Sequence, residues 1–420
     1  MAKRIFIATS GSRGDVEPFI ALSKALQNAG YGVVLAAPPD FGGWIASHGI
    51  AHQPIGDAAR GYVDELASAI ERNKFFRSLK NETFEQRAYA LYADLLKASE
   101  GADLLIFSMM LAGMTSVAEA RRIPAIGVYL QPLLTTADFA IPMQRRFSYG
   151  GFLNRLSHRA ADLALWTLFR GWWNAMRRDV LGLKPLGRFH DMRTVNGKPM
   201  PLLFAISEAL LSRPRDWPDH ASMTGNWFLD GGEDWTPPPD LAAFLKEGPA
   251  PVYVGFGSMP LGQSKSKAHM IIEALKLSGQ RAVIARGWGG WDDDIFAPLG
   301  ANAHVIDAAP HRKLFPLMAG VVHHGGAGTT AACFRAGRPA FVTPLILDQF
   351  FYANLVRRHG AGPKALPVKS WHPLALARQL AELTSVPGYG RRAREVSERM
   401  AKENGLARAK DVVQSVIGLP

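Results

Sequence analysis

Apolar runs that end in glycine-rich loops recur along the chain and predict parallel β/α units. In the first half, the apolar and polar positions predict a strand at 3–8, a loop at 11–14, a helix at 16–29 and a strand at 32–37. In the second half, the same order returns as a strand at 252–255, a helix near 267–277 and a strand at 281–285. The sequence therefore predicts an α/β fold in which each half starts with such a unit.

A segment that is poor in packing residues separates the two halves. Residues 230–240 are rich in Gly, Pro and acidic side chains, which is typical of a linker. We therefore expect an N-terminal domain at 1–229, a linker at 230–240 and a C-terminal domain at 241–395. The last residues, 396–420, are expected to form a helix that crosses back to the N-terminal domain.

One loop of the second half has the composition of an anion site. Two valines lead into the run from His323 to Thr330, which holds three glycines and two threonines just where a helix at 329–336 should begin. Free N–H groups and the positive end of the helix dipole attract phosphate oxygens, and glycine lets the backbone approach them. His324 adds a side-chain donor. The alternative is a tight turn that needs glycine for its geometry alone.

Composition and length are those of a globular protein. The 420 residues are 48% hydrophobic and 20% charged, which favours two or three domains. The sequence reads as having neither an export signal nor an apolar run of about 18 residues, and Cys333 is its one cysteine. An intrachain disulfide or a cysteine-based metal cluster is therefore excluded, and a cytoplasmic location is expected.

Basic charge is concentrated in one aromatic segment. The net charge is +12, and residues 141–190 contribute +7 of it, from nine basic and two acidic side chains. Helical spacing at 154–179 brings arginines and tryptophans onto one amphipathic helix, as in segments that contact lipid at a membrane surface. We expect peripheral contact with the inner face of the membrane; the alternative is a solvated helix whose aromatic face covers the core. No nucleic-acid motif accompanies the charge, so we expect no nucleic-acid partner.

The first loop argues against a dinucleotide cofactor. Residues 9–14 lack the G-x-G-x-x-G order, and the strand at 32–37 ends in Leu35-Ala36-Ala37-Pro38, without an acidic residue that would bind a ribose hydroxyl. In open parallel sheets, ligands bind at the carboxyl ends of the strands. The loops that contain Ser258 and His324 should therefore line one edge of the C-terminal domain and hold a phosphate-bearing ligand.

The motifs, taken in order, resemble a known family. They are Gly11-Ser12-Arg13-Gly14-Asp15-Val16-Glu17-Pro18-Phe19, the region from Trp172 to Leu183, residues 255–259, the histidine-glycine loop and Asp348-Gln349. Together they resemble the family 1 glycosyltransferases of the UDP-glycosyltransferase superfamily, in the branch that acts on sterols, glycolipids and antibiotic aglycones. The resemblance implies the GT-B architecture, in which two Rossmann-like β/α/β domains face each other across a cleft. It also implies transfer of a sugar from a nucleotide donor to a small lipophilic acceptor.

Asp15 is the candidate catalytic base. It follows the first glycine loop at the start of the predicted helix, and a carboxylate within hydrogen-bond reach can take the proton of an acceptor hydroxyl. The wider family commonly has histidine here, whereas the sterol and antibiotic branch resembles this chain in having aspartate. The alternative role of Asp15 is to cap the helix or to interact with its dipole.

Donor phosphates are expected to bind between the two domains. Ser258 is similar to the family's phosphate-binding serine, and donors around the histidine-glycine loop would stabilise the charge of the leaving diphosphate. Arg13 closes over the phosphates in this interpretation; the alternative is a surface arginine. The predicted diphosphate contacts are Ser12, Arg13, Gly14, Ser258, His324, Gly326, Ala327, Gly328 and Thr329. No metal or other cofactor is then required, and we interpret the acidic triplet at 292–294 as a solvated loop.

The remaining donor contacts follow from the resemblance. Asp348 and Gln349 offer acceptors and donors to adjacent sugar hydroxyls, with a helix cap as the alternative. The nucleobase and ribose are expected to contact Arg286, Gly287, Trp288, Ala309, Pro310 and His311.

These assignments predict an inverting, metal-independent hexosyltransferase. An acceptor hydroxyl, deprotonated by Asp15, attacks the anomeric carbon while the diphosphate departs toward His324. UDP-glucose is the favoured donor, and the acceptor is a hydrophobic alcohol of sterol, lipid, polyketide or flavonoid type held by residues 75–92 and 130–175. One alternative is a dTDP-deoxysugar-dependent enzyme that modifies a natural product or a hydroxyacyl lipid. Others are a non-catalytic nucleotide-binding auxiliary protein and a nucleotide-sugar epimerase.

Overall fold

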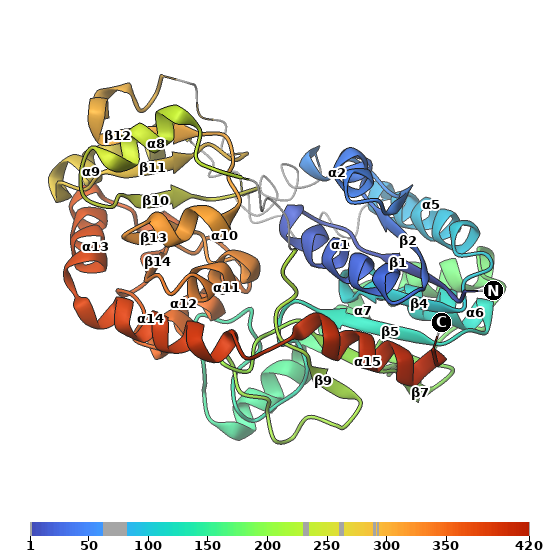
Figure 1. The fold of residues 1–420 in the computed structure, drawn as a ribbon. Helices are drawn as coiled ribbons and strands as arrows, with labels where there is room; N and C mark the ends of the chain where they lie inside the picture. Colours follow the sequence, from blue (N-terminus) through green and yellow to red (C-terminus); the bar gives the residue numbers. More distant parts are fainter. Residues whose placement is uncertain are drawn as a thin grey trace.

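The computed structural model describes residues 2–61, 82–229, 235–259, 264–288, 291 and 294–419. These residues form two parallel β-sheets, each covered by helices, that lie beside each other (Figure 1). Parts of three predicted segments fall outside the described residues: 75–81 of the acceptor region, 230–234 of the linker and Asp292 and Asp293 of the acidic triplet.

The N-terminal sheet has seven parallel strands in the order β3-β2-β1-β4-β5-β8-β9. Its central strands are buried on both faces because helices cover both sides of a parallel sheet, which is why they read as continuous apolar runs. The strands are β1 (Arg4–Ala8), β2 (Gly32–Ala37), β3 (Ala51–Pro54), β4 (Leu104–Ser108), β5 (Ala125–Tyr129), β8 (Leu202–Phe204) and β9 (Ala221–Met223).

The C-terminal sheet has five parallel strands in the order β12-β11-β10-β13-β14. The strands are β10 (Val252–Gly255), β11 (Ala282–Ala285), β12 (Ala303–Ile306), β13 (Gly320–His323) and β14 (Ala340–Val342). A short antiparallel pair, β6 (Thr194–Val195) and β7 (Lys198–Pro199), stands apart from both sheets. Since all five strands of the C-terminal sheet run the same way, the loops after β10, β11 and β13 meet at one edge.

Helices connect the strands in both domains. The N-terminal helices are α1 (Arg13–Asn28), α2 (Gly42–Ser47), α5 (Glu82–Ala98), α6 (Met114–Arg121) and α7 (Gly151–Asp179). The later helices are α8 (Pro239–Lys246), α9 (Ser264–Ser278), α10 (His311–Leu314), α11 (Ala327–Arg335), α12 (Gln349–Arg358), α13 (Pro373–Ser385), α14 (Pro387–Met400) and α15 (Gly405–Ile417). Short 3₁₀ turns are η1 (Pro39–Phe41), η2 (Met109–Leu111), η3 (Ala297–Asn302), η4 (Phe315–Leu317) and η5 (Val368–Ser370).

Four helices start earlier than the sequence predicts, among them α9, which begins at Ser264. The first turns of α1 and α11 include Gly14 and Gly328, which the sequence interpretation placed in loops, and α7 begins at Gly151. Glycine is unfavourable in a helix, but in a first turn the backbone N–H groups are free in any case. The helix N-termini therefore lie directly on the glycine loops, which is what an anion site needs.

The tryptophans of α7 cover the core of the N-terminal domain. Trp166, Trp172 and Trp173 are buried, and Trp172 stacks on Tyr92 of α5 with ring centroids 6.0 Å apart. The indole N–H of Trp173 donates to the Ser116 hydroxyl of α6 at 3.0 Å. In the second half of α7 the aromatic face therefore packs against the core of the N-terminal domain. This is the alternative that the sequence analysis gave for residues 141–190.

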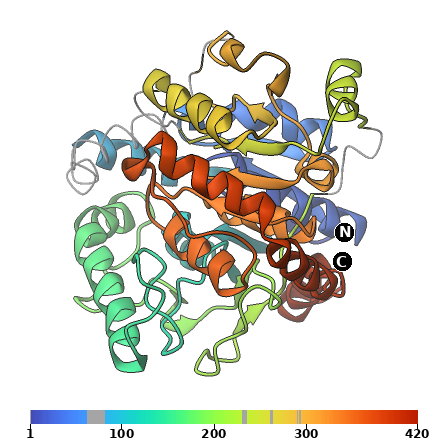
Figure 2. The same ribbon diagram turned by 90° about the vertical axis from the view of Figure 1, so that its left-hand side faces the viewer.

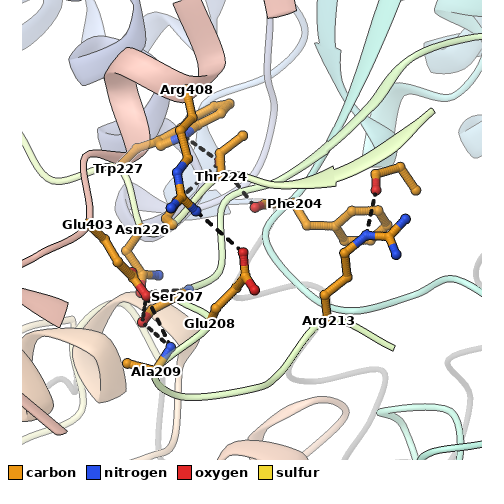
Figure 3. Close-up of polar contacts among 12 residues, drawn as sticks. Phe204, Ser207, Glu208, Ala209, Arg213, Thr224, Asn226, Trp227, Glu403 and Arg408 are labelled. Carbon is orange, nitrogen blue, oxygen red and sulfur yellow. Dashed lines mark hydrogen bonds and ion pairs between the residues drawn. The ribbon is translucent and has the colours of Figure 1, made fainter. Parts of the chain in front are cut away.

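The chain returns to the N-terminal domain after α14, and Figure 3 shows the contacts at this crossing. The Glu403 carboxylate accepts hydrogen bonds from the Ser207 hydroxyl at 3.0 Å and from the Ala209 backbone N–H at 3.1 Å. One helical turn later, Arg408 forms an ion pair with Glu208 at 3.3 Å. Beyond the crossing, α15 packs against α1 and its Ala409 and Val413 join the N-terminal core.

Direct contacts join the two domains near the carboxyl ends of their strands. The Tyr352 hydroxyl of α12 donates to the Leu130 carbonyl at 2.9 Å, just beyond β5. Phe147 stacks on Phe351 of α12 with ring centroids 5.2 Å apart. Because these contacts surround the start of α12, they bring its first residue and the loops after β1 and β5 to the same place.

Candidate active site

The loop between β1 and α1 folds the Asp15 carboxylate back onto its own helix. Ser12 is the N-cap of α1, and its backbone N–H and hydroxyl donate to Asp15 Oδ2 at 2.8 and 3.0 Å. Gly11 has a φ of 113°, and a Cβ there would lie 2.5 Å from Asp15 Oδ2. A glycine at this position is therefore needed for the carboxylate to reach the cap, and the predicted capping role of Asp15 is present.

Capping leaves the second oxygen of the carboxylate, Oδ1, without a partner among the described residues. Burial in the cleft raises the pKa of Asp15 above its ordinary value, against the lowering effect of the two Ser12 hydrogen bonds. A carboxylate with a raised pKa and one oxygen not used by the helix has the properties of a general base.

Asp348 faces Asp15 from the other domain. Burial is the first cause that raises the pKa of Asp348 to about 7, and the negative charge of Asp15 is the second. The Gln131 side chain, two residues beyond β5, hydrogen-bonds to Asp348 and opposes this rise. The two domains thus place these two carboxyl groups close enough for the charge of Asp15 to raise the pKa of Asp348.

The loop between β13 and α11 leaves a helix N-terminus open. Gly326 is the N-cap of α11, and among the described residues no side chain caps this end. A Cβ on Gly326 would lie 2.5 Å from His324 Nε2, so the imidazole lies directly against the first turn. Open amides, the helix dipole and one imidazole therefore converge at the predicted diphosphate position.

The histidines of this edge are uncharged at neutral pH. Burial lowers the pKa of His324 to about 4, and burial together with the charges of Arg13 and His324 lowers the pKa of His311 to about 4. Burial also lowers the pKa of His323 well below its ordinary value, and its Nδ1 accepts the Gly325 N–H at 3.0 Å. These imidazoles can donate a hydrogen bond to a phosphate, but they carry no fixed positive charge.

The loop after β10 reaches the same edge. A Cβ on Gly257 would lie 3.7 Å from the His324 ring, which places Ser258 beside the histidine-glycine loop. The Trp288 N–H donates to the Gly257 carbonyl at 2.9 Å, so the loop after β11 supports it. The structure thus brings Ser258, His324 and the first turn of α11 together.

The segment before α12 is strained and internally hydrogen-bonded. Leu347 has a φ of 49°, which is unusual for a non-glycine residue, and Asp348 follows it as the N-cap of α12. The side-chain oxygen Oε1 of Gln349 accepts hydrogen bonds from the backbone N–H groups of Leu345 and Ile346 at 2.7 and 3.2 Å. Of the predicted sugar contacts, Asp348 faces the cleft, whereas the oxygen of Gln349 is used to shape the loop and its amide nitrogen remains for a ligand.

The predicted nucleobase contacts lie in two places. Arg286 and Ala309 line a pocket of about 260 Å³ with Trp235 and His304, and Arg286 forms an ion pair with Asp307 at 2.9 Å. Trp288 instead packs partly against the core of the N-terminal domain. Pro310 is the N-cap of α10 and His311 begins this helix, where its ring stacks on Phe315 at 4.2 Å.

Arg13 lies between the domains. Its guanidinium lies 4.4 Å from the centroid of the Trp44 ring and 3.5 Å from the Glu17 carboxylate, and it is largely exposed. Its charge nevertheless reaches His311 of the other domain. Arg13 is therefore a surface arginine, as the alternative interpretation proposed. It also faces the domain in which the donor diphosphate is expected to bind.

Sequence reasoning missed Gln131 and Tyr352. Gln131 lies two residues beyond the end of β5, and the rule that ligands bind at the carboxyl ends of parallel strands could have identified it. Tyr352 has no such signal, because its hydrogen bond to Leu130 crosses between domains that are far apart in sequence.

Two searches of the structure bear on other site types. Within the described ranges, no helix is long and apolar enough to cross a bilayer. The same part of the chain contains no group of three His, Cys, Asp or Glu side chains that could hold a metal ion.

Family models match both ends of the chain. The model described as "Glycosyltransferase family 28 N-terminal domain" matches residues 5–128. The model described as "Erythromycin biosynthesis protein CIII-like, C-terminal domain" matches residues 292–419.

The architecture is that of known glycosyltransferase structures. The glycotransferase of kitacinnamycin superposes with a TM-score of 0.73 at 18% identity and covers 100% of both chains. The glycosyltransferase VinC, solved in complex with dTDP, gives 0.67 at 18% identity over 98% of this chain and 99% of that one. Two Rossmann-like domains facing across a cleft define the GT-B fold, as the sequence predicted.

Sequence relatives give the family. A sterol 3-beta-glucosyltransferase of Arabidopsis thaliana is 32% identical over 423 residues, which cover 97% of this chain and 67% of that protein. A sterol 3-beta-glucosyltransferase of Neosartorya fischeri is 33% identical over 424 residues, 97% of this chain and 29% of the relative. The chain therefore spans less than a third of the fungal relatives. It belongs to the family 1 glycosyltransferases of GT-B fold, which confirms the resemblance seen in the sequence.

Proposed function

We propose that this protein transfers a hexose from a nucleotide diphosphate sugar to the hydroxyl of a hydrophobic alcohol, with inversion at the anomeric carbon. UDP-glucose is the favoured donor and a sterol the favoured acceptor. The names of the relatives from Arabidopsis thaliana and Neosartorya fischeri support glucose as the sugar and a sterol as the acceptor. The observation that carries the proposal is the position of Asp15, opposite Asp348 and the open end of α11.

The proposed reaction is a single displacement. Asp15 takes the proton of the acceptor hydroxyl, whose oxygen attacks the anomeric carbon from the side of the N-terminal domain. The bond from that carbon to the diphosphate breaks, and its electron pair leaves with the phosphate oxygen. The amides at the start of α11, with Ser258 and the neutral His324, donate to the departing diphosphate and stabilise its charge.

Asp348 orients the sugar in this proposal. With a pKa of about 7, its carboxyl group can both accept and donate hydrogen bonds to sugar hydroxyls near neutral pH. A bound sugar would lie between Asp348 and Asp15 and separate the two carboxyl groups. The Ser12 hydrogen bonds oppose the rise in the pKa of Asp15 and favour the carboxylate form that accepts the proton of the acceptor hydroxyl.

Two alternatives keep the same fold. A dTDP-deoxysugar donor is supported by the solved VinC complex with dTDP, although the likeness to this chain is one of fold. A non-catalytic nucleotide-binding protein would need no base, and the presence of Asp15 in the cleft favours the enzyme.

The test is a panel of UDP- and dTDP-sugars combined with hydrophobic alcohols, including sterols, and scored for release of the nucleoside diphosphate. We expect release with UDP-glucose and a sterol, and a glucoside product whose anomeric configuration is opposite to that of the donor. If no combination releases diphosphate above background while the protein still binds nucleotide, the auxiliary function is correct instead. A product with retained configuration would refute the single displacement.

A further inference from the structure

The first half of α7 presents apolar side chains to water. Phe152 is 79% exposed, and Leu153, Leu156 and Leu163 are each about half exposed. Spacings of four and seven residues place Phe152, Leu156 and Leu163 on one side of the helix. Figure 2 shows α7 at the edge of the molecule, away from the centre of either sheet.

Exposed apolar side chains are concentrated in this part of the molecule. Of the thirteen large hydrophobic residues exposed in the described chain, seven lie at 143–189. They are Met143, Tyr149, Phe152, Leu153, Leu156, Leu163 and Phe189. A single exposed leucine is ordinary, but a set concentrated on α7, which carries four of the seven, and on the segments that flank it in sequence marks an interaction surface. We call these seven residues the α7 apolar face.

Basic side chains border the α7 apolar face. The exposed ones are Arg145, Arg146, Arg155, Arg159, Arg170 and Arg188. Of the acidic groups nearby, Asp216 is paired with Arg155 at 3.0 Å and Asp162 with the buried Arg193 at 2.7 Å. The border therefore carries a net positive charge.

A groove of about 640 Å³ runs beside the same face. Arg155, Arg159, Leu163 and Phe189 line it, so it shares side chains with both the apolar face and its basic border. Apolar side chains that can enter a bilayer, next to arginines that bind anionic head groups, are the combination used by proteins that lie on lipid surfaces.

We propose that the α7 apolar face, with its arginine border, rests on the surface of an anionic lipid bilayer. This inference goes beyond the proposed reaction and does not depend on it. It also changes the residues that the sequence suggested, because Trp166, Trp172 and Trp173 lie in the core and the contact falls to Phe152 and the leucines.

The face is continuous with the domain interface. The Arg145 carbonyl accepts a hydrogen bond from the Asn354 side chain of α12 at 3.0 Å, and Arg358 of α12 stacks 4.2 Å from the Phe147 ring centroid. Helix α12 begins immediately after Asp348. A bilayer at the α7 apolar face would therefore lie one helix away from the sugar contact.

The test is co-sedimentation of the full chain with two kinds of vesicle, pure phosphatidylcholine and an equal mixture of phosphatidylcholine and phosphatidylglycerol. We expect the protein to sediment with the mixed vesicles at low salt, less at high salt, and little with the neutral ones. The double substitution Phe152→Ser with Leu156→Ser should weaken partitioning by about tenfold or more, because two apolar side chains leave the bilayer. Replacing Arg145, Arg146 and Arg159 by Gln should weaken binding at low salt and reduce its salt dependence.

The matched control is Leu317→Ser with Leu374→Ser, two leucines of similar exposure on the C-terminal domain. It should sediment as the unmodified chain does. Thermal midpoints and calorimetric affinity for UDP, which binds to the other domain in the proposed reaction, should be unchanged in all variants, which separates lipid binding from folding and from donor binding. Equal partitioning of the Phe152 and Leu156 variant and the unmodified chain would overturn the proposal, as would the absence of sedimentation with mixed vesicles.

Discussion

The loops that precede α1 and α11 follow the same local plan and have opposite chemistry. Each leads from a parallel strand into a helix, and each contains a glycine in the left-handed region, Gly11 at 113° and Gly325 at 97°. In α1 the third helical residue is Asp15, and its carboxylate occupies the free amide of the N-cap. In α11 the third helical residue is Thr329, and the first amides stay open.

The difference teaches that one residue decides what a strand-to-helix loop can bind. An acidic side chain at the third position supplies the negative charge that the helix N-terminus attracts. Without it, the same N-terminus attracts the negative charge of a ligand. The first loop thus offers a base and the second a phosphate site, and the two face each other across the cleft.

The largest effect is expected from Asp15→Asn. The amide cannot take a proton, so turnover should fall by about 10²–10⁴-fold while nucleotide-sugar affinity stays within a few-fold. Diphosphate release and calorimetric binding measure the two quantities. The thermal midpoint is the control, since Asn can still accept from Ser12. Near-normal turnover would mean that Asp15 is a cap and nothing more.

The next effect is expected from Thr329→Asp, which copies the first loop into the second. Its carboxylate should occupy the start of α11 and repel the diphosphate, so nucleotide affinity should fall roughly 10–100-fold. Thr329→Asn keeps the size and the capping ability without the charge, and should lose much less. Equal losses in the two variants would show that the helix N-terminus does not bind the phosphates.

A third prediction concerns the charge of Asp348 and the pH dependence of stability. Its folded-state pKa of about 7 lies above the ordinary aspartate value of 3.8, so its contribution to stability is present below about pH 4 and is lost as the pH rises through 7. Asp348→Asn cannot ionise. It should therefore leave stability unchanged in acid and raise the free energy of unfolding by about 1–3 kcal/mol above pH 7.

Denaturant unfolding at several pH values measures this difference. Repeating it in an Asp15→Asn background should shift the transition to lower pH, because the charge of Asp15 helps to raise the Asp348 pKa. If the pH of the transition stays the same, the charge of Asp15 does not affect the pKa of Asp348, and the two carboxylates do not share one cleft.

The smallest effect is expected from Arg13→Gln. Arg13 is largely exposed but its charge reaches the donor side, so its loss should weaken nucleotide-sugar affinity about 2–5-fold at low salt. Trp44→Leu removes the ring under the guanidinium and keeps the charge, and should have a smaller effect. If Trp44→Leu has the larger effect, Arg13 acts by packing and the sequence assignment to the diphosphate is wrong.

Much of this fold can be read from the sequence because its strands are buried on both faces. A strand such as β1 then appears as an apolar run, and the glycine loop that follows identifies its carboxyl end. The residues of the loops before α1 and α11 can be predicted from this pattern. The first residues of the two helices cannot be predicted from it, because glycine in the first turn of a helix looks the same in sequence as glycine in a loop.

Contacts between the domains could not be predicted. Gln131 and Tyr352 matter through partners more than 200 residues away in the chain, and nothing in their local sequence names those partners. Likewise, the periodicity of α7 shows two apolar faces but not which one packs on α5 and α6. For this reason the tryptophans, which were expected at the membrane, lie in the core instead.

The uncharged histidines at the donor edge have a kinetic consequence. The field of a dipole falls off faster with distance than that of a charge, so His311, His323 and His324 act on a nucleotide only once it has arrived. The approach of the nucleotide is instead driven by the long-range electric field of the protein's net charge of +12, which salt screens. We therefore expect salt to slow the arrival of the donor while leaving its residence time nearly constant.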